Sequence, residues 1–363
     1  MDKIPPAFER RCIRAGSLRS ALLLDGPAAH KDARIGRSRE GRPISAYRIG
    51  DGPRRVSLIG GCHADEPVGP RFLRRLVRFL AGPGGAVLRK AATWFVVPHV
   101  NPDGAAANAA WQTPGAGRYD FPAYLRHRVR ELPGDDVEFG FPRGEEDRAA
   151  RPENRAAWAF WRDAAPFDLH VSLHGMSVAA GPYFLVERSW WPRLREAAAG
   201  LAREVEGAGH TLHDVERHGE KGFHRLARGF CSRPDSRAMR RHFQAVGDPE
   251  TAGRFRPSSM EAVRALGGDP LTLVTEMPLF VTPGVGVELG PPDPALVRWR
   301  KRIAGWDARI RKAAEEGEEV AARVAAEVRG EAARAGLRAM PVADQMRFQW
   351  AFVRMGLGAV GAG

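Results

Sequence analysis

The stretch GGCHADEPVGP, residues 60–70, holds a histidine and a glutamate three residues apart, between an apolar run and a helical pattern. The apolar run RRVSLIGG before it predicts a buried strand over 54–61. The run after it repeats apolar residues at helical spacing, which predicts a helix that ends at Gly82. We therefore expect His63 and Glu66 where a strand gives way to a helix.

Apolar runs and helical patterns continue to alternate along the rest of the chain. Further strands are expected at 92–100, 167–175, 181–187 and 271–280, and helices at 191–207 and about 294–336. This alternation predicts an α/β fold, a sheet with helices on its faces. No repeat or linker divides the chain, so we expect one main domain over 35–290. Residues 1–34 are then an N-terminal extension, and 291–363 a C-terminal helical segment that packs on the same domain.

Composition limits the classes of protein that the chain can belong to. It has 363 residues, 44% of them hydrophobic, which is enough for a large core. No apolar run approaches the roughly 20 residues that span a bilayer, and the apolar run ALLL near the N-terminus is too short for a secretory signal. The three cysteines are widely spaced, so a disulfide framework is not expected. We predict a soluble cytoplasmic protein without a membrane partner.

The net charge of +13 suggests nucleic-acid binding at first sight. The arginines are scattered among acidic residues, as in RGEEDRAARPENR, and do not form one basic stripe. The chain also has no nucleic-acid-binding motif. We therefore expect no nucleic-acid partner.

Polar residues follow or interrupt several of the expected strands: His63, Glu66, Asn101, Asp103, His174 and Glu276. In open α/β sheets, ligands bind at the carboxyl ends of the strands. Two imidazoles and a carboxylate suit a catalytic zinc, which typically takes three protein ligands and leaves one position for water. His63, Glu66 and His174 are the candidate ligands, and Glu276 is then free to act as a general base.

Each of these residues also has a purely structural interpretation. Asp65 or Glu66 could cap the following helix by accepting backbone N–H groups, and His174 could be a hydrogen-bonded core histidine. A carboxylate inside LVTEMPLF is harder to explain in this way. Burying Glu276 without a partner costs several kcal/mol, so a functional role or an ion pair is expected.

Five segments, taken in order, resemble motifs of the zinc metallocarboxypeptidases related to carboxypeptidase A. They are IGRSREGRPISAYRIG (35–50), GGCHADEPVGP (60–70), VPHVNPDG (97–104), SLHG (172–175) and VTEMP (274–278). The resemblance implies a single carboxypeptidase-like domain with a mixed central β-sheet and helices on both faces. It also implies one zinc ion per chain held by His63, Glu66 and His174, with Glu276 as the catalytic base and a peptide as substrate.

One segment departs from the family pattern. Relatives carry D-L-N-R-N-F-P, whose Asn and Arg bind the free C-terminal carboxylate of the substrate, but this chain has DVEFGFP at 136–142. Glu138 stands where Asn is expected, and Phe139 where Arg is expected. Phenylalanine cannot form the bidentate fork of arginine, and glutamate repels an anion. Glu138, Phe139, Asn101 and Arg143 are the candidate substrate-binding residues, with Arg143 or Arg155 as a replacement for the missing arginine.

The family also has an arginine that stabilises the oxyanion, shortly before this segment. Arg126, Arg128 and Arg130 all lie near that place, and Arg128 and Arg130 are favoured without a choice between them. The tyrosine that many relatives have before the glutamate strand is missing, because no tyrosine follows Tyr183.

These residues predict a zinc-dependent hydrolase of peptide or amide bonds with unusual substrate recognition. Two alternatives stay open: a deacylase of N-acyl amino acids, as in the aspartoacylase and desuccinylase branch, and a pseudoenzyme that only binds. The intact set of four metal-site residues argues against the pseudoenzyme. The substrate, a peptide or an acyl-amino acid, and the oligomeric state stay undetermined.

Overall fold

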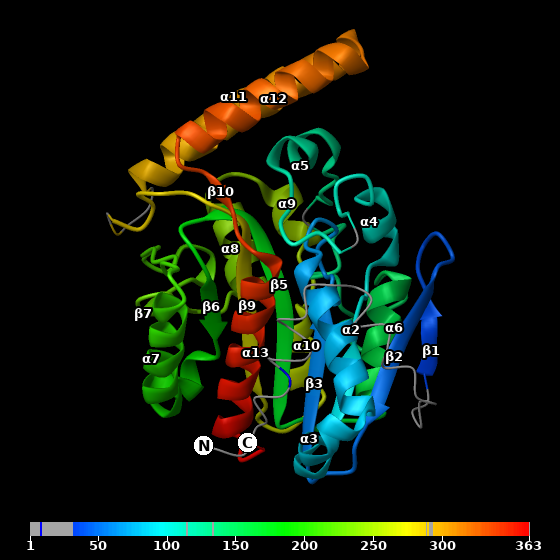
Figure 1. The fold of residues 1–363 in the computed structure, drawn as a ribbon. Coiled ribbons are helices and arrows are strands. Elements are labelled where there is room, and N and C mark those ends of the chain that lie inside the picture. Colours follow the sequence, from blue (N-terminus) through cyan, green and yellow to red (C-terminus); the bar gives the residue numbers. More distant parts are fainter. Residues whose placement is uncertain are drawn as a thin grey trace.

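In the part of the chain that the structure describes, ten strands form one mixed β-sheet with helices on both faces (Figure 1), which confirms the predicted fold class. The computed structural model describes residues 8, 32–113, 115–132, 134–287, 289 and 293–362. The predicted N-terminal extension, residues 1–34, lies almost entirely outside the described residues. None of the described helices combines the length and the apolar character that a membrane crossing requires.

The four central strands run parallel, and the flanking strands complete the sheet. The strands are β1 (Asp32–Arg37), β2 (Pro43–Ile49), β3 (Arg54–Gly60), β4 (Ala92–Val97), β5 (Leu169–Ala179), β6 (Tyr183–Val186), β7 (Arg225–Ala227), β8 (Phe230–Ser232), β9 (Leu271–Val281) and β10 (Arg338–Ala339). Their order is β1-β2-β4-β3-β5-β9-β6-β8-β7, and β10 pairs with β9. Because β4, β3, β5 and β9 are mutually parallel, their carboxyl ends meet at one edge.

The helices connect these strands and extend the C-terminal part. They are α2 (Val68–Ala81), α3 (Ala86–Ala91), α4 (Pro102–Ala107), α5 (Phe121–His127), α6 (Pro152–Arg162), α7 (Trp191–Gly207), α8 (Ser236–Ala245), α9 (Pro249–Arg254), α10 (Ser259–Ala265), α11 (Pro294–Glu316), α12 (Glu318–Arg334) and α13 (Val342–Ala359). The pattern expected as one helix over 294–336 is two helices, because the chain turns at Gly317, where φ is 122°.

Successive side chains of β3 point to opposite faces of the sheet, and each face carries its own apolar cluster. Val56 and Leu58 face a large apolar cluster with α2, α7 and α13, whereas Ile59 faces a second cluster with α6 and α10. Helix α13, which follows the α11–α12 pair, returns to the sheet, and its Trp350 and Phe352 are fully buried. Residues of the C-terminal segment therefore complete the core of the same sheet.

Helices α11 and α12 lie side by side and project beyond the sheet (Figure 1). They contact the body at α5, where Arg126 pairs with Glu318 and Arg329 pairs with Asp120 at 2.9 Å. This contact holds the segment that leads from α5 toward the carboxyl edge of the sheet.

Candidate metal centre

The turn between β3 and α2 brings His63 and Glu66 to the carboxyl edge of the sheet. Gly61 has a φ of +75°, which glycine adopts without strain. Gly69, in the first turn of α2, lies so close to β5 that an added Cβ would be 2.3 Å from the carbonyl oxygen of Leu173. The close approach places Glu66 directly beside the strand that carries His174.

Glu66 does not cap the helix. The N-cap of α2 is Pro67, and no side chain caps this end. The Glu66 carboxylate instead accepts a hydrogen bond from the backbone N–H of Gly175 at 3.1 Å. The capping interpretation of Glu66 is therefore wrong.

His63, Glu66 and His174 form a tight group of three donor atoms, all within 4.8 Å of one another. His63 Nδ1 lies 2.7 Å from Glu66 Oε1, His174 Nδ1 lies 2.9 Å from Glu66 Oε2, and the two Nδ1 atoms are 3.2 Å apart. Ligand atoms about 2.0–2.1 Å from a tetrahedral zinc lie about 3.3 Å from one another. The three side chains thus fit a zinc ion with only a small outward movement.

The electrostatics of this group also suit a cation. Burial works against ionisation, yet the imidazoles of His63 and His174 hold the pKa of the Glu66 carboxyl well below its usual range. Against the effect of burial, the Glu66 carboxylate raises the pKa of His63 to about 9. Protons on the imidazoles thus stabilise the buried carboxylate, and a metal cation can replace them.

Glu276 lies next to this group on the neighbouring strand. It pairs in parallel register with His174, so both side chains leave the same face of the sheet. Its carboxylate makes no hydrogen bond or ion pair with any residue that the structure describes. Burial and the Glu66 carboxylate raise the pKa of Glu276 to about 8, against the opposing effect of both imidazoles and Arg130. A carboxyl group kept free beside a metal-ligand set is what a general base requires.

A second carboxylate faces the Nε2 atom of each imidazole, on the ring edge opposite Glu66. Asp136 Oδ2 is 4.0 Å from His63 Nε2, and Glu138 Oε2 is 3.0 Å from His174 Nε2. Glu138 is only 5% exposed. The expectation that its charge faces the substrate is therefore corrected: the carboxylate lies against His174. The alignment of DVEFGFP alone could not show this contact, because His174 comes from a distant strand.

Three further substrate-binding candidates lie elsewhere in the fold. Asn101 is fully buried, where its Oδ1 accepts from the Gly104 N–H and its Nδ2 donates to Glu131. The Phe139 ring is 8% exposed and packs edge-on against Phe255, with centroids 5.2 Å apart. The prediction of a substrate contact for these two residues is not supported, because their side chains are used within the fold.

Arg143, the last of the substrate-binding candidates, is exposed. Its backbone N–H donates a hydrogen bond to Asp147 Oδ2 at 2.9 Å. Neither it nor Arg155 has a hydrogen bond or ion pair with a member of the metal-ligand group among the residues that the structure describes.

The three candidate oxyanion arginines point in different directions. Arg126 pairs with Glu318, and Arg128 stacks over Tyr124 and lies 3.8 Å from Asp307. Arg130 alone turns toward the metal-ligand group.

Arg130 Nη1 lies 3.5 Å from Asp65 Oδ2. Although burial acts in the opposite direction, Asp65, Glu66 and Glu276 raise the pKa of the Arg130 guanidinium. Its side chain is still 52% exposed and so is accessible from solvent. Of Arg128 and Arg130, the two candidates for the oxyanion arginine, the structure favours Arg130.

Two of the recognised motifs support the site from a distance. Asp103 of NPDG accepts hydrogen bonds from Ser38 Oγ at 2.6 Å, the Glu40 N–H at 3.0 Å and Arg42 at 2.7 Å. The segment around GRSREGRPI is thereby bound to the turn after β4. Asp103 is thus a structural residue, and these two motifs occur together because they contact each other.

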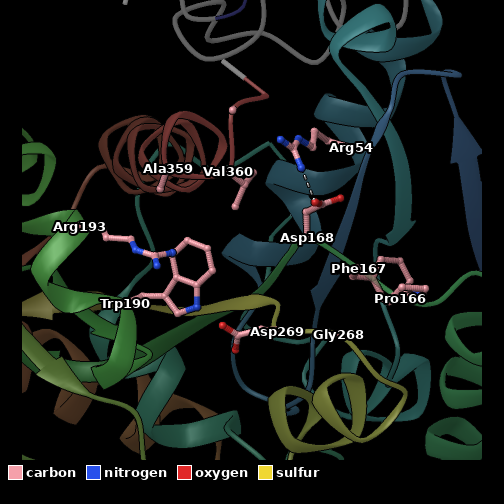
Figure 2. Close-up of a pocket in the computed structure, with 11 residues that line it drawn as sticks. Arg54, Pro166, Phe167, Asp168, Trp190, Arg193, Gly268, Asp269, Ala359 and Val360 are labelled. Atoms are coloured by element: carbon pink, nitrogen blue, oxygen red, sulfur yellow. Dashed lines mark hydrogen bonds and ion pairs between the residues drawn. The ribbon is translucent and has the colours of Figure 1, made fainter.

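A cavity of about 500 Å³ lies at the opposite end of the sheet (Figure 2). It is lined by Arg54, the first residue of β3, and by Asp168 and Asp269, which lie just before β5 and β9. Arg193 stacks over Trp190 at its wall. It has two arginines and two aspartates but no histidine or cysteine. The metal-ligand group at the carboxyl ends of the strands is therefore a separate place, and the position expected for chemistry in such sheets.

Comparison with known families identifies one family. The family model described as zinc carboxypeptidase matches residues 24–229, a range that includes His63, Glu66 and His174 but ends before Glu276. No curated protein matches the chain.

Several solved structures resemble the chain at low identity. Thrombin activatable fibrinolysis inhibitor shares 16% identity over 70% of this chain and 65% of its own, with a TM-score of 0.40. Its bovine form in complex with tick carboxypeptidase inhibitor shares 15% over 70% and 82%, with a TM-score of 0.42. A metallo-carboxypeptidase from Pseudomonas aeruginosa, in complex with (2-guanidinoethylmercapto)succinic acid, shares 20% over 72% and 58%, with a TM-score of 0.39. The chain thus spans less than two thirds of the first and third structures.

Proposed function

The chain belongs to the zinc carboxypeptidase family, and from this premise we propose that it is a zinc-dependent hydrolase of a peptide or related amide bond. One observation carries the proposal: His63, Glu66 and His174 converge within 4.8 Å, and the unpaired Glu276 lies beside them in register with His174. A binding protein has no need for a free carboxylate at that position.

The three convergent side chains would hold one zinc ion through Nδ1 of each histidine and the Glu66 carboxylate. Bound zinc supplies a Lewis acid that polarises the scissile carbonyl and lowers the pKa of a water molecule to about 7. The side chain of His63 is 19% exposed, whereas His174 and Glu66 are nearly covered. A substrate therefore reaches the group from the His63 side.

Glu276 is the proposed general base. Its carboxylate takes a proton from the attacking water and passes it to the leaving nitrogen, so that the amine leaves in neutral form. A divalent cation held by the neighbouring ligands would favour the ionised Glu276 carboxylate, the form that accepts a proton, because a nearby positive charge lowers the pKa of an acid.

Arg130 is the proposed oxyanion group. Its guanidinium is close enough to Glu66 and Glu276 to feel their charges, and half of its side chain is open to solvent. A fixed cation at this place stabilises the negative charge that develops on the carbonyl oxygen.

Substrate recognition differs from that expected of an enzyme that requires a free C-terminus. Position 139 offers a buried phenyl ring, and the charge of Glu138 is directed at His174. Neither residue offers a cation for a substrate carboxylate. We therefore include peptide amides and N-acyl amino acids among the substrates, and a deacylase of N-acyl amino acids uses the same ligands and base.

The test starts from metal content. Purified protein should contain one zinc ion per chain and should hydrolyse members of a panel of peptide acids, peptide amides and N-acyl amino acids. A chelator should abolish this activity, and added zinc should restore it. A correctly folded protein that neither binds zinc nor cleaves any member of the panel would refute the proposal. Zinc binding without turnover would leave the binding pseudoenzyme as the better description.

A further inference from the structure

We propose that Glu138 is a positioning residue for the metal ligand His174, and not a residue that binds substrate. The inference rests on the proposed function, since it assigns a role toward the zinc ion that the site would hold. It concerns a position at which the sequence departs from its family, so the family pattern does not supply it.

The geometry of the His174 ring carries the inference. Its Nδ1 faces Glu66 and His63, and its Nε2 faces Glu138 at 3.0 Å. A neutral imidazole has one N–H donor and one acceptor nitrogen, and an ionised carboxylate only accepts hydrogen bonds. With Glu138 as acceptor, the proton is held on Nε2 and the lone pair of Nδ1 points at the metal position.

Burial keeps solvent away from this contact. His174 is 2% exposed and Glu138 is 5% exposed, so solvent does not compete for either group. A carboxylate buried without a partner is costly, and Nε2 of His174 lies at hydrogen-bond distance from it. Rotation of the ring is therefore restrained from both edges.

The backbone holds Glu138 in place. The N–H of Val137 donates to the carbonyl of Cys62 at 3.3 Å, next to His63, and the N–H of Arg256 donates to the carbonyl of Phe139 at 2.9 Å. The N–H of Phe139 also donates to Asp136 Oδ1 at 3.2 Å. The turn that carries Glu138 is thus tied to the metal-binding loop itself and is not a mobile pocket wall.

Cys62, Glu138 and His174 offer a competing interpretation, because their ligand atoms also lie within 4.8 Å of one another. A second metal there would have to use His174 Nε2. All three residues are nearly fully buried, at 1%, 5% and 2% exposure, so the group offers no open position. We therefore assign the Glu138–His174 contact to a hydrogen bond.

The experiment measures zinc affinity by competition with a chromophoric chelator. Glu138→Ala should weaken zinc binding by about 10–100-fold, the usual effect of removing an outer carboxylate from a ligating histidine. Glu138→Gln keeps an oxygen acceptor and should lose clearly less. Glu131→Gln, a change at a carboxylate that binds Asn101 and Arg151 instead, is the matched control and should leave the affinity unchanged.

A second measurement needs no variant. Long-range ¹H–¹⁵N NMR of the zinc-loaded wild-type protein should show zinc on His174 Nδ1 and a slowly exchanging proton on Nε2. Zinc on Nε2, two zinc ions per chain, or a Glu138→Ala variant with wild-type affinity would each overturn the inference. If His174→Ala loses zinc while Glu138→Ala keeps it, only this inference fails. If the wild-type protein binds no zinc, the proposed function fails with it.

Discussion

Glu66 Oε2 lies 2.9 Å from His174 Nδ1, although the two residues are 108 positions apart in the chain. The contact depends on the parallel pairing of β3 with β5 and on the close packing of Gly69 against Leu173. The same carboxylate also lies 2.7 Å from His63 Nδ1. Glu66 is therefore the side chain that joins the loop after β3 to β5, and it is the first residue to test.

Glu66→Ala is expected to lose stoichiometric zinc, because the change removes one of three ligands and the only anionic one. Zinc content after gel filtration is the measurement. Glu40→Ala, at an exposed carboxylate, serves as the control. Unchanged zinc occupancy in the Glu66 variant would show that the metal-ligand assignment is wrong.

Glu276→Gln is expected to keep zinc and to lose activity. The amide cannot accept the proton from water, and general acid–base catalysis is worth about 100- to 10,000-fold. Kinetics and zinc content are measured on the same preparation. Near wild-type turnover would exclude Glu276 as the base, and loss of zinc would make it a ligand instead.

Arg130→Ala and Arg128→Ala are expected to differ. Removing a donor to the oxyanion lowers kcat by about 100- to 1,000-fold, and Arg130 is the arginine that faces Glu66 and Glu276. Arg128 stacks over Tyr124 and lies 3.8 Å from Asp307, so its loss should lower the thermal midpoint with little effect on kcat. Equal kinetic effects in the two variants, or the reverse order, would contradict the assignment.

The wild-type protein is expected to show no preference for a peptide acid over its C-terminal amide. A carboxylate clamp needs an arginine fork, and position 139 carries a phenyl ring packed on Phe255. The comparison is kcat/KM for the two substrates. A strong preference for the acid would mean that a cation outside the 136–139 turn binds the carboxylate, and Arg143→Ala and Arg155→Ala would then identify it.

His170 is expected to make the protein sensitive to acid. It is fully buried in β5, with Nδ1 3.0 Å from Ser57 Oγ, and burial lowers its pKa to about 3. Between pH 6.5 and about pH 3, the His170 imidazole is protonated in the unfolded chain but neutral in the native protein. The free energy of unfolding therefore decreases as the pH falls through this range.

This loss amounts to about 3 kcal/mol between pH 7 and pH 4.5. Guanidinium chloride denaturation at both values measures the total difference, to which the buried His99 and His213 also contribute, because burial lowers their pKa values to about 3 and about 4. His170→Gln should reduce the total difference by about this amount without abolishing it, whatever it does to stability at pH 7, and His224→Gln, at an exposed ring, should not. An unchanged pH dependence in His170→Gln would refute the prediction.

The strands and helices nearest the site could be predicted from local pattern. After its two arginines β3 is mostly apolar, as is β9, whereas β5 alternates apolar residues with His170, Ser172 and His174, which are all buried. The helical spacing after Pro67 predicts α2. The family resemblance identified the five motifs, because each is a short contiguous segment. The break between α11 and α12 at Gly317 was not predicted, since the apolar spacing continues on both sides of it.

The sequence by itself determined which residues could carry the chemistry: two histidines and two glutamates in recognisable segments, and a glutamate and a phenylalanine where the family has an amide and an arginine. Only the tertiary structure decided what each side chain touches. Asn101 turned inward to Glu131, Arg130 rather than Arg128 turned to the site, and Glu138 met His174. The reason is physical: motif spacing sets the position of a residue along the chain, but the partner that fixes the direction of its side chain comes from a different strand or helix.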